Sequence, residues 1–138
     1  MHTKRTILLL LSIVVLIAAI GVVYVFNKPH RDVKDEAAIV VNADSLFKAF
    51  SSDEETANKL YLDKALVVEG TVMEVLTNQQ GQHVILLKTS DPIAAVSATF
   101  TEMPKATISK GLVIKIKGIC SGYASDVVLR DCIVEGVQ

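Results

Sequence analysis

The chain has 138 residues, 51% of them hydrophobic, and its 14 basic and 15 acidic side chains leave a formal net charge of −1 at pH 7. From residue 36 onward nine basic residues stand against thirteen acidic ones, so this part of the chain carries a net charge of −4. Domains that bind the phosphate backbone of nucleic acids are normally basic, and the charge balance therefore argues against strong nucleic-acid binding.

The first predicted element is an unbroken apolar run from Ile7 to Phe26. A helix of about 20 residues spans the hydrocarbon core of a bilayer, which is roughly 30 Å thick. We therefore predict that residues 1–26 form a short tail and a single transmembrane anchor helix. A cleaved secretory signal is the alternative, although its one candidate cleavage site, between Ala19 and Gly21, is a poor one. No cysteine closely follows the run, which argues against a lipid-anchored lipoprotein.

Positive charges flank the apolar run on both sides. Lys4 and Arg5 adjoin its start and emerge first during synthesis, whereas Lys28, Arg31 and Lys34 lie beyond its end. The adjoining pair favours a cytoplasmic N-terminus by the positive-inside rule. The predicted localisation is therefore the membrane, in a single pass, with the C-terminal domain outside the cytoplasm.

Beyond the run the chain divides into a polar linker, residues 27–41, and one domain, residues 42–138. Charged residues around a proline predict that the linker is a solvated spacer. The domain, at about 100 residues, is long enough for a single hydrophobic core.

Two short helices are expected at the start of this domain. Asn42 or Asp44 can cap the first helix, and Ser52 with Glu55 forms a capping box for the second. Each helix has apolar residues at helical spacing on the face that should pack inward. These residues are Leu46, Phe47 and Phe50 on the first helix and Ala57, Leu60 and Tyr61 on the second.

From Ala65 the apolar residues recur with a period of two, which predicts strands. Gly70 lies inside the first strand and permits a bulge or a sharp coil there. In the last strand, a bulge near Arg130 and Asp131 would turn all four apolar residues toward the core. The segment 102–111 is too polar for a strand and can hold one short helix. The five predicted strands cover residues 65–76, 83–89, 94–101, 112–120 and 127–136.

This order of elements indicates the fold class. Five strands, a short helical connection between the third and fourth, and a glycine inside a long first strand are typical of the OB-fold, a small Greek-key barrel. We predict a mainly β fold, a five-stranded OB-fold barrel preceded by two short α-helices and an N-terminal transmembrane helix.

Apolar residues, glycines, cysteines and one lysine along the domain also follow a family pattern. They are Leu46, Phe50, Ala57, Tyr61, Val68, Gly70, Val72, Val96, Ala98, Phe100, Lys110, Gly111, Gly118, Cys120, Gly122, Val127, Leu129 and Cys132. With these residues, the stretch 42–134 resembles the tRNA_anti-like family, bacterial OB-fold modules often found behind a transmembrane or lipoprotein anchor. The resemblance implies the architecture, and it implies nucleic-acid binding only by analogy of fold.

OB-folds bind ligands across their second and third strands and the neighbouring loops, with aromatic platforms and a basic track. The candidate ligand face comprises outward residues of those strands, one lysine and one loop tyrosine. These residues are His83, Ile85, Leu87, Lys88, Ser97, Thr99 and Tyr123. Only Tyr123 offers a free ring on the barrel, so this face predicts weak base stacking at best.

Two cysteines lie on the neighbouring fourth and fifth strands. Cys120 and Cys132 can form a disulfide in an oxidising compartment, or they can be buried free thiols in the cytoplasm, and the spacing leaves both alternatives open. The pair is not a CxxC motif and no histidine is near it in the sequence. We therefore expect no metal site and no cofactor.

Catalytic residues are not expected either. His83 opens a strand without a recognisable nucleophile motif, and Glu69 and Glu74 fall on opposite faces of their strand unless Gly70 bulges. The predicted function is a non-catalytic binding module of the bacterial envelope, held in the membrane by residues 7–26. Its expected partner is a protein or a small envelope ligand, and weak single-stranded nucleic-acid binding is the alternative.

Overall fold

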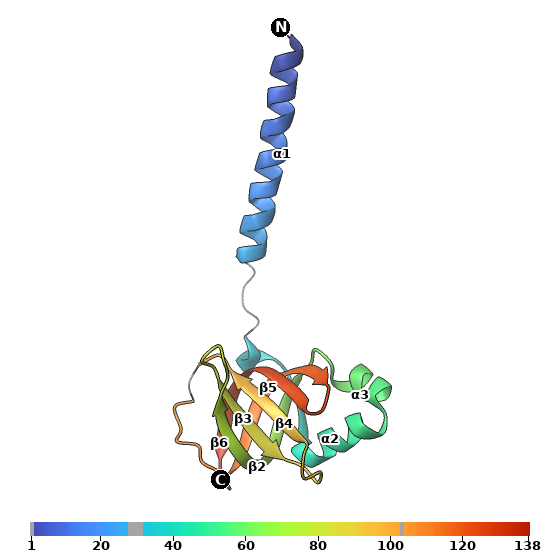
Figure 1. Cartoon of the computed structure of the whole chain (residues 1–138), viewed down its shortest axis with the longest axis vertical. Coiled ribbons are helices and arrows are strands. Elements are labelled where there is room, and N and C mark those ends of the chain that lie inside the picture. Colours follow the sequence, from blue (N-terminus) through green and yellow to red (C-terminus); the bar gives the residue numbers. More distant parts are fainter. Residues whose placement is uncertain (1, 28–31, 103) are drawn as a thin grey trace. The chain divides into compact units, whose positions relative to one another are not determined.

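The structure is a computed structural model, and it describes residues 2–27, 32–102 and 104–138. It separates into two compact units, Met1–Arg31 and Asp32–Gln138. The first unit contains helix α1 (His2–Phe26), drawn in Figure 1. Its side chains are exposed from residue 10 onward. Over the part of the chain that the structure describes, no helix is both long enough and apolar enough to cross a membrane. The predicted transmembrane anchor is thus unconfirmed.

The second unit is built around a closed barrel of five strands. The strand order is β2–β3–β4–β6–β5, and β5 pairs back onto β2. All these pairs are antiparallel except β4–β6, which is parallel. The predicted five-stranded barrel is confirmed, and each strand end lies within three residues of its predicted place. The strands are β2 (Ala65–Thr77), β3 (His83–Lys88), β4 (Ala95–Phe100), β5 (Val113–Tyr123) and β6 (Val127–Val137).

The connection between β4 and β5 differs from the prediction. Its described residues, 101–102 and 104–112, form bends and turns, so the expected short helix is wrong. The end of the segment instead pairs with β2, where the Gly111 amide donates to the Val72 carbonyl and the Val72 amide donates to the Leu112 carbonyl. These hydrogen bonds hold the end of the connection against β2, after a turn in which the Leu112 amide donates to the Ser109 carbonyl at 3.3 Å.

Helix α2 (Ala43–Ser52) follows strand β1 (Ile39–Asn42) and begins at a capped turn. The side chain of Asn42 accepts a hydrogen bond from the Asp44 amide, which confirms one of the two predicted caps. Leu46, Phe47 and Phe50 are buried, also as predicted. The apolar face of the helix therefore packs against the core of the barrel.

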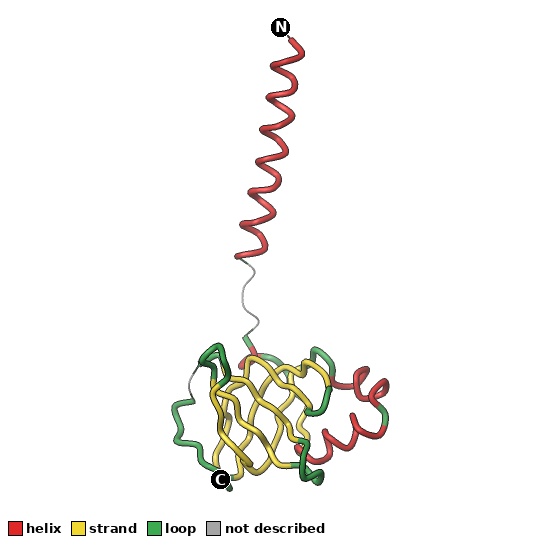
Figure 2. Tube along the Cα trace, viewed as in Figure 1, coloured by secondary structure: helices red, strands yellow, loops and turns green. Residues whose placement is uncertain are grey.

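Helix α3 (Glu54–Tyr61) has a different cap from the predicted one. Asp53 accepts from the Thr56 amide at 3.0 Å, whereas Ser52 still belongs to α2, so the predicted capping box is wrong. Ala57 is buried, but Leu60 is 49% exposed and does not belong to the inward face. In Figure 2 the two helices lie together beside the barrel.

The second half of the predicted linker is part of the folded unit. Strand β1 (Ile39–Asn42) pairs in parallel with residues 66–69 of β2, and a single 3₁₀ turn, η1 (Val33–Asp35), precedes it. Val33 is only 5% exposed because it packs against Ala65 and Ile119. The solvated spacer expected over residues 27–41 is therefore wrong from Asp32 onward, and residues 28–31 lie outside the described part of the chain.

Lys117 fixes the same segment from the barrel side. Its ammonium donates to the Lys34 carbonyl at 2.9 Å and lies 4.0 Å from the Glu135 carboxylate. Lys117 is only 6% exposed. A buried ammonium needs such partners, and the docked segment supplies one of them.

We expect the Val33→Ala variant to lower the free energy of unfolding by about 1 to 2 kcal/mol, because two buried methyl groups are lost. Amide hydrogen exchange of residues 33–38 should increase more than exchange inside the barrel. Val40→Ala is the matched control, since Val40 is 73% exposed and should have little effect. Equal effects of the two substitutions would contradict docking through Val33.

The predicted bulge in the last strand is confirmed. The register of β6 on β5 shifts between the pairs Lys117–Ile133 and Ile119–Arg130. Asp131 occupies the shift with a positive φ of 53°. Apolar residues on both sides of the bulge then face inward: Val127, Leu129 and Cys132 are buried, and Val134 packs against the core.

Candidate functional site

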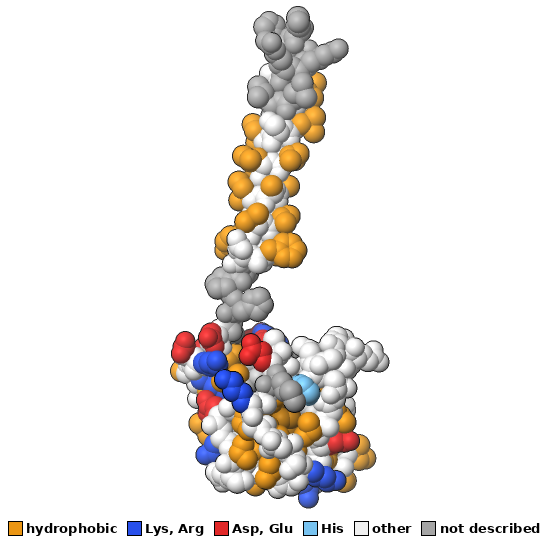
Figure 3. All heavy atoms as spheres, turned by 90° about the vertical axis from the view of Figure 1, so that its left-hand side faces the viewer, with side chains coloured by type: hydrophobic (Ala, Val, Ile, Leu, Met, Phe, Trp, Pro, Cys, Tyr) orange, Lys and Arg blue, Asp and Glu red, His pale blue; other side chains and the backbone are white. Residues whose placement is uncertain are grey.

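The outer surface of β2, β3, β4 and β6 is the first candidate site. Ser97 and Thr99 point outward from β4, as predicted, because the residues that alternate with them are buried. Their register partners on β3 are Leu86 and Val84. Figure 3 shows hydrophobic side chains gathered on the barrel surface with charged groups around them. We call the outward side of these four strands the outer face. It consists of Glu74, Leu76, Val84, Leu86, Ser97, Thr99 and Val128.

The predicted orientation of β3 on this face is wrong. Ile85 and Leu87 are 1% and 0% exposed and belong to the core. The register explains their burial, since they pair with the inward-facing Ala98 and Val96. The strand has apolar residues on both faces, so alternation alone cannot tell which face is inward. The outward residues could have been found only through their pairing with the hydroxyl residues of β4.

His83 and Lys88 lie at opposite ends of β3. His83 is half-buried and pairs with the buried Phe100, so it does not belong to the outer face. Lys88 is exposed at the other end of the strand, on the side of the barrel where helix α2 begins. The two polar residues predicted for one ligand face therefore serve different parts of the surface.

Tyr123 does not offer the free ring that was predicted. Its ring lies 6.2 Å from that of Phe47, edge-on, and 5.8 Å from that of Phe50, stacked. The aromatic residue thus ties β5 to helix α2. The outer face as defined contains no aromatic side chain, and stacking of bases on it has no platform.

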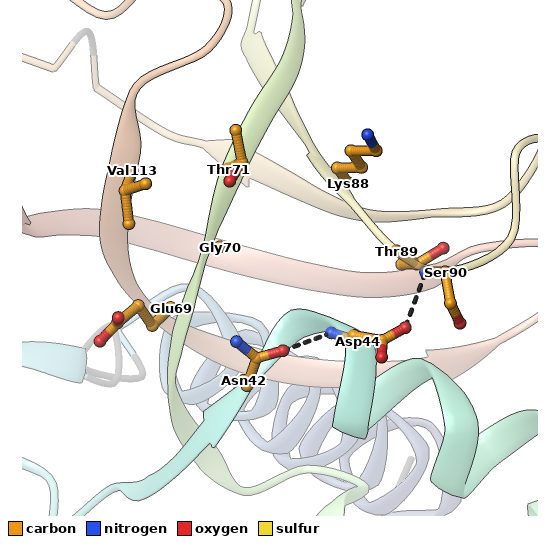
Figure 4. Close-up of a pocket in the computed structure, with 9 residues that line it drawn as sticks. All are labelled: Asn42, Asp44, Glu69, Gly70, Thr71, Lys88, Thr89, Ser90 and Val113. Carbon is orange, nitrogen blue, oxygen red and sulfur yellow. Dashed lines mark hydrogen bonds between the residues drawn. The ribbon is translucent and has the colours of Figure 1, made fainter.

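A cavity of about 320 Å³ is the second candidate site, and its lining residues are drawn in Figure 4. It opens where β1 ends, α2 begins and β3 leaves the barrel. Of its residues, only Lys88 was predicted as a ligand residue, because strand β1, which supplies one wall, was not expected from the sequence. The lining residues are Asn42, Asp44, Glu69, Gly70, Thr71, Lys88, Thr89, Ser90 and Val113.

Both carboxylates of this cavity have basic partners. Asp44 lies 2.7 Å from the Lys48 ammonium and accepts from the Ser90 amide at 2.7 Å, a bond drawn in Figure 4. Glu69 pairs with Lys115 on the next strand at 3.3 Å. Within the residues that the structure describes, no three His, Cys, Asp or Glu side chains gather to hold a metal ion.

A family assignment follows from comparison with known proteins. A family model described as tRNA_anti-like matches residues 1–133. The chain belongs to the tRNA_anti-like family. No curated protein matches the chain. Family membership agrees with the resemblance seen in the sequence and with the observed barrel.

One solved structure is similar to this tRNA_anti-like chain. It is the crystal structure of a lipoprotein from Klebsiella pneumoniae subsp. pneumoniae, named as a candidate nucleic acid-binding protein. The TM-score is 0.56 at 15% sequence identity, and the match covers 70% of this chain and 92% of the other. At this identity the likeness shows a common fold.

The two cysteines of this tRNA_anti-like domain are free thiols in the structure, and both are buried. The bulge in β6 keeps the two cysteines from lying opposite each other, because the register places Cys120 opposite Leu129 and leaves Cys132 facing Gly118. Burial raises the pKa of both thiols. Neutral, buried thiols react poorly with labelling reagents.

Asp44 provides a pH-dependent prediction for the same tRNA_anti-like domain. Its bonds with Lys48 and then Ser90 lower its pKa to about 2, against about 3.9 in an unfolded chain. A lowered pKa stabilises the fold above pH 4, and this contribution disappears as the pH falls toward 2. The difference in unfolding free energy between wild type and Asp44→Asn should therefore shrink over this range in urea titrations. A difference that is independent of pH would contradict the role of the carboxylate charge.

Proposed function

We propose that the chain is a membrane-anchored, non-catalytic binding module of the bacterial envelope that binds a protein partner on the outer face. One observation carries the proposal: Leu76, Val84, Leu86 and Val128 form an accessible apolar group around the hydroxyls of the outer face. Apolar side chains beside hydrogen-bonding groups suit a protein segment better than a charged backbone. The acidic balance of the domain agrees with this choice.

Membrane anchoring is supported by the uncharged apolar run from Ile7 to Phe26 in the sequence. The similar Klebsiella protein is named as a lipoprotein, which is consistent with a family that works at membranes. The positive-inside rule supports an extracytoplasmic domain.

The topology can be tested with a single added thiol. Ser125 is exposed, and both native cysteines are buried, so Ser125→Cys should react with a membrane-impermeant maleimide against a low background. We expect labelling in intact cells. Labelling only after cell lysis would place the domain inside and contradict the proposed orientation.

The partner can be sought with a photo-crosslinking amino acid at Leu86 of the full chain in its own membrane. We expect one discrete crosslinked protein that persists at high salt, because apolar contacts are little screened. The crosslinker at Lys59, exposed on α3, is the matched control. Adding Val84→Glu should abolish the product, and persistence of the product in this variant would contradict binding on the outer face.

Weak single-stranded nucleic-acid binding is the second candidate, and the name of the similar structure favours it. The test is fluorescence anisotropy of the full chain in detergent micelles with a short oligothymidine at low and physiological salt. Phosphate contacts would give saturable binding that weakens steeply with salt. We expect no saturable binding at either concentration, and a steep salt dependence would favour this candidate over the protein partner.

A further inference from the structure

Strand β1 lies at an open edge of the sheet. It pairs with β2 on one side, and among the residues that the structure describes no strand lies on its other side. Val40 is 73% exposed and its neighbour Ile39 is 40% exposed. Successive residues of a strand point to opposite faces, so apolar surface is accessible on both faces of this edge.

The hydrogen bonds of β2 determine which way the backbone of β1 faces. Lys64, directly before β2, accepts from the Cys120 amide, and Val72 exchanges hydrogen bonds with residues 111 and 112. The register between β2 and β5 is unbroken from Ala65 to Thr71. Since antiparallel pairs alternate, the even-numbered residues of this stretch face β5 and the odd-numbered residues face β1.

The parallel register of β1 then leaves a row of backbone groups on the open side. Val40 lies opposite Val67, an odd-numbered residue, so Val67 bonds to residues 39 and 41 and not to Val40. The amide and carbonyl of Val40 therefore point away from β2, as do the Ala38 carbonyl and the Asn42 amide. Among the described residues, no backbone hydrogen bond reaches these groups from the open side.

We propose that this open edge of β1 pairs with the same edge of a second copy of the chain, antiparallel and about a two-fold axis at Val40. In this register the amide and carbonyl of Val40 exchange hydrogen bonds with those of Val40 in the second copy. The Ala38 carbonyl accepts from the Asn42 amide of the second copy, and the reverse bond forms by symmetry. Each group in the row thus gains a partner.

The side chains of the edge also favour a second copy. Residues 37–41 are all uncharged and apolar, and the two-fold register places Ile39 opposite Val41 of the other copy. No like charges meet within these residues, so the edge is complementary to itself. Apart from its short length, the edge has no lysine, proline or bulge of the kind that protects natural edge strands from pairing.

The size of the contact sets its strength. Pairing along one strand of four residues is a small contact beside the roughly 1,200 to 2,000 Å² that stable interfaces bury. We therefore expect a weak association that depends on concentration. The edge shares no residue with the outer face, so this inference does not depend on the proposed protein partner.

Disulfide trapping of the full chain in its own membrane tests the pairing, because it captures weak complexes. In a hydrogen-bonded antiparallel pair the Cα atoms are about 5.5 Å apart, a separation that a disulfide can bridge. Val40→Cys should give a disulfide-linked dimer on mild oxidation with copper phenanthroline. Both native cysteines are buried, so the background should be low. Absence of the dimer would overturn the proposal.

Ala37→Cys is the matched control for the register. Ala37 is exposed on the same segment, but the two-fold axis at Val40 separates the two copies of residue 37 by roughly 20 Å. This variant should give little or no dimer under the same conditions. Equal trapping of Ala37→Cys and Val40→Cys would overturn the two-fold register and indicate random collision.

A proline variant tests the backbone bonds themselves. Val40→Pro removes the amide that faces the open edge and no bond to β2. Association can be measured by energy transfer between dyes attached to Ser125→Cys, an exposed position, in the full chain in detergent micelles. We expect Val40→Pro to weaken association about tenfold, because two hydrogen bonds are lost across the axis. Val40→Ala keeps the amide and should retain association, and equal association of the two variants would overturn pairing through this edge.

Discussion

The Phe50→Ala variant is expected to lose about 3 to 5 kcal/mol of unfolding free energy. Phe50 is 1% exposed, and its ring lies 6.1 Å from that of Tyr61 and 5.8 Å from that of Tyr123. Truncation would leave a cavity where α2, α3 and β5 meet. Urea unfolding followed by tyrosine fluorescence can measure the loss, since the chain has no tryptophan and two of its three tyrosines contact Phe50.

Leu60→Ala is the control for this substitution. Leu60 is on the neighbouring helix α3 but is 49% exposed, so its truncation should cost less than about 1 kcal/mol. If Phe50→Ala cost no more than the control, α2 would not be an integral part of the core. The helices would then be an appendage to the barrel.

Gly118→Ala is expected to destabilise the fold by about 1 to 3 kcal/mol through overpacking. A Cβ atom at Gly118 would lie 2.5 Å from the Cys132 Sγ and 3.2 Å from the Arg130 carbonyl oxygen. The backbone of the bulge cannot move away without disturbing the β5–β6 register. The loss can be measured by the same unfolding experiment.

Gly136→Ala is the matched control, because a Cβ atom there meets nothing within 4 Å. Adding Cys132→Ala to Gly118→Ala should recover part of the loss, since the sulfur is the nearest atom. A double variant less stable than the sum of the two single losses would show that the contact is not repulsive.

The periodicity of the sequence was enough to predict all five barrel strands and the bulge in β6. Alternating apolar residues specify a strand and its inward face when the other face is polar, as in β4, where Ser97 and Thr99 face outward. The bulge was predictable because Val127 and Leu129 fall out of step with Cys132. In these elements local pattern and tertiary environment agree.

Features that depend on distant contacts were not predictable. β3 is apolar on both faces, so its orientation comes from pairing with β4. β1 has only four residues, and it becomes a strand because β2 offers it a free edge at Leu66–Glu69. The ring of Tyr123 is covered by residues more than 70 positions earlier in the chain. The cavity of the second candidate site depends on β1, so the sequence alone could not indicate it.

The docked segment before the barrel has a mechanical consequence. A pulling force applied to this unit at Asp32 acts first on the packing of Val33 and on the hydrogen bond between Lys117 and Lys34. Strand β1 comes next, held to β2 by four register pairs, while the barrel is closed on itself and offers no strand end to peel at this point. Tension should therefore extend the chain in steps, releasing η1 and β1 before the outer face loses its shape.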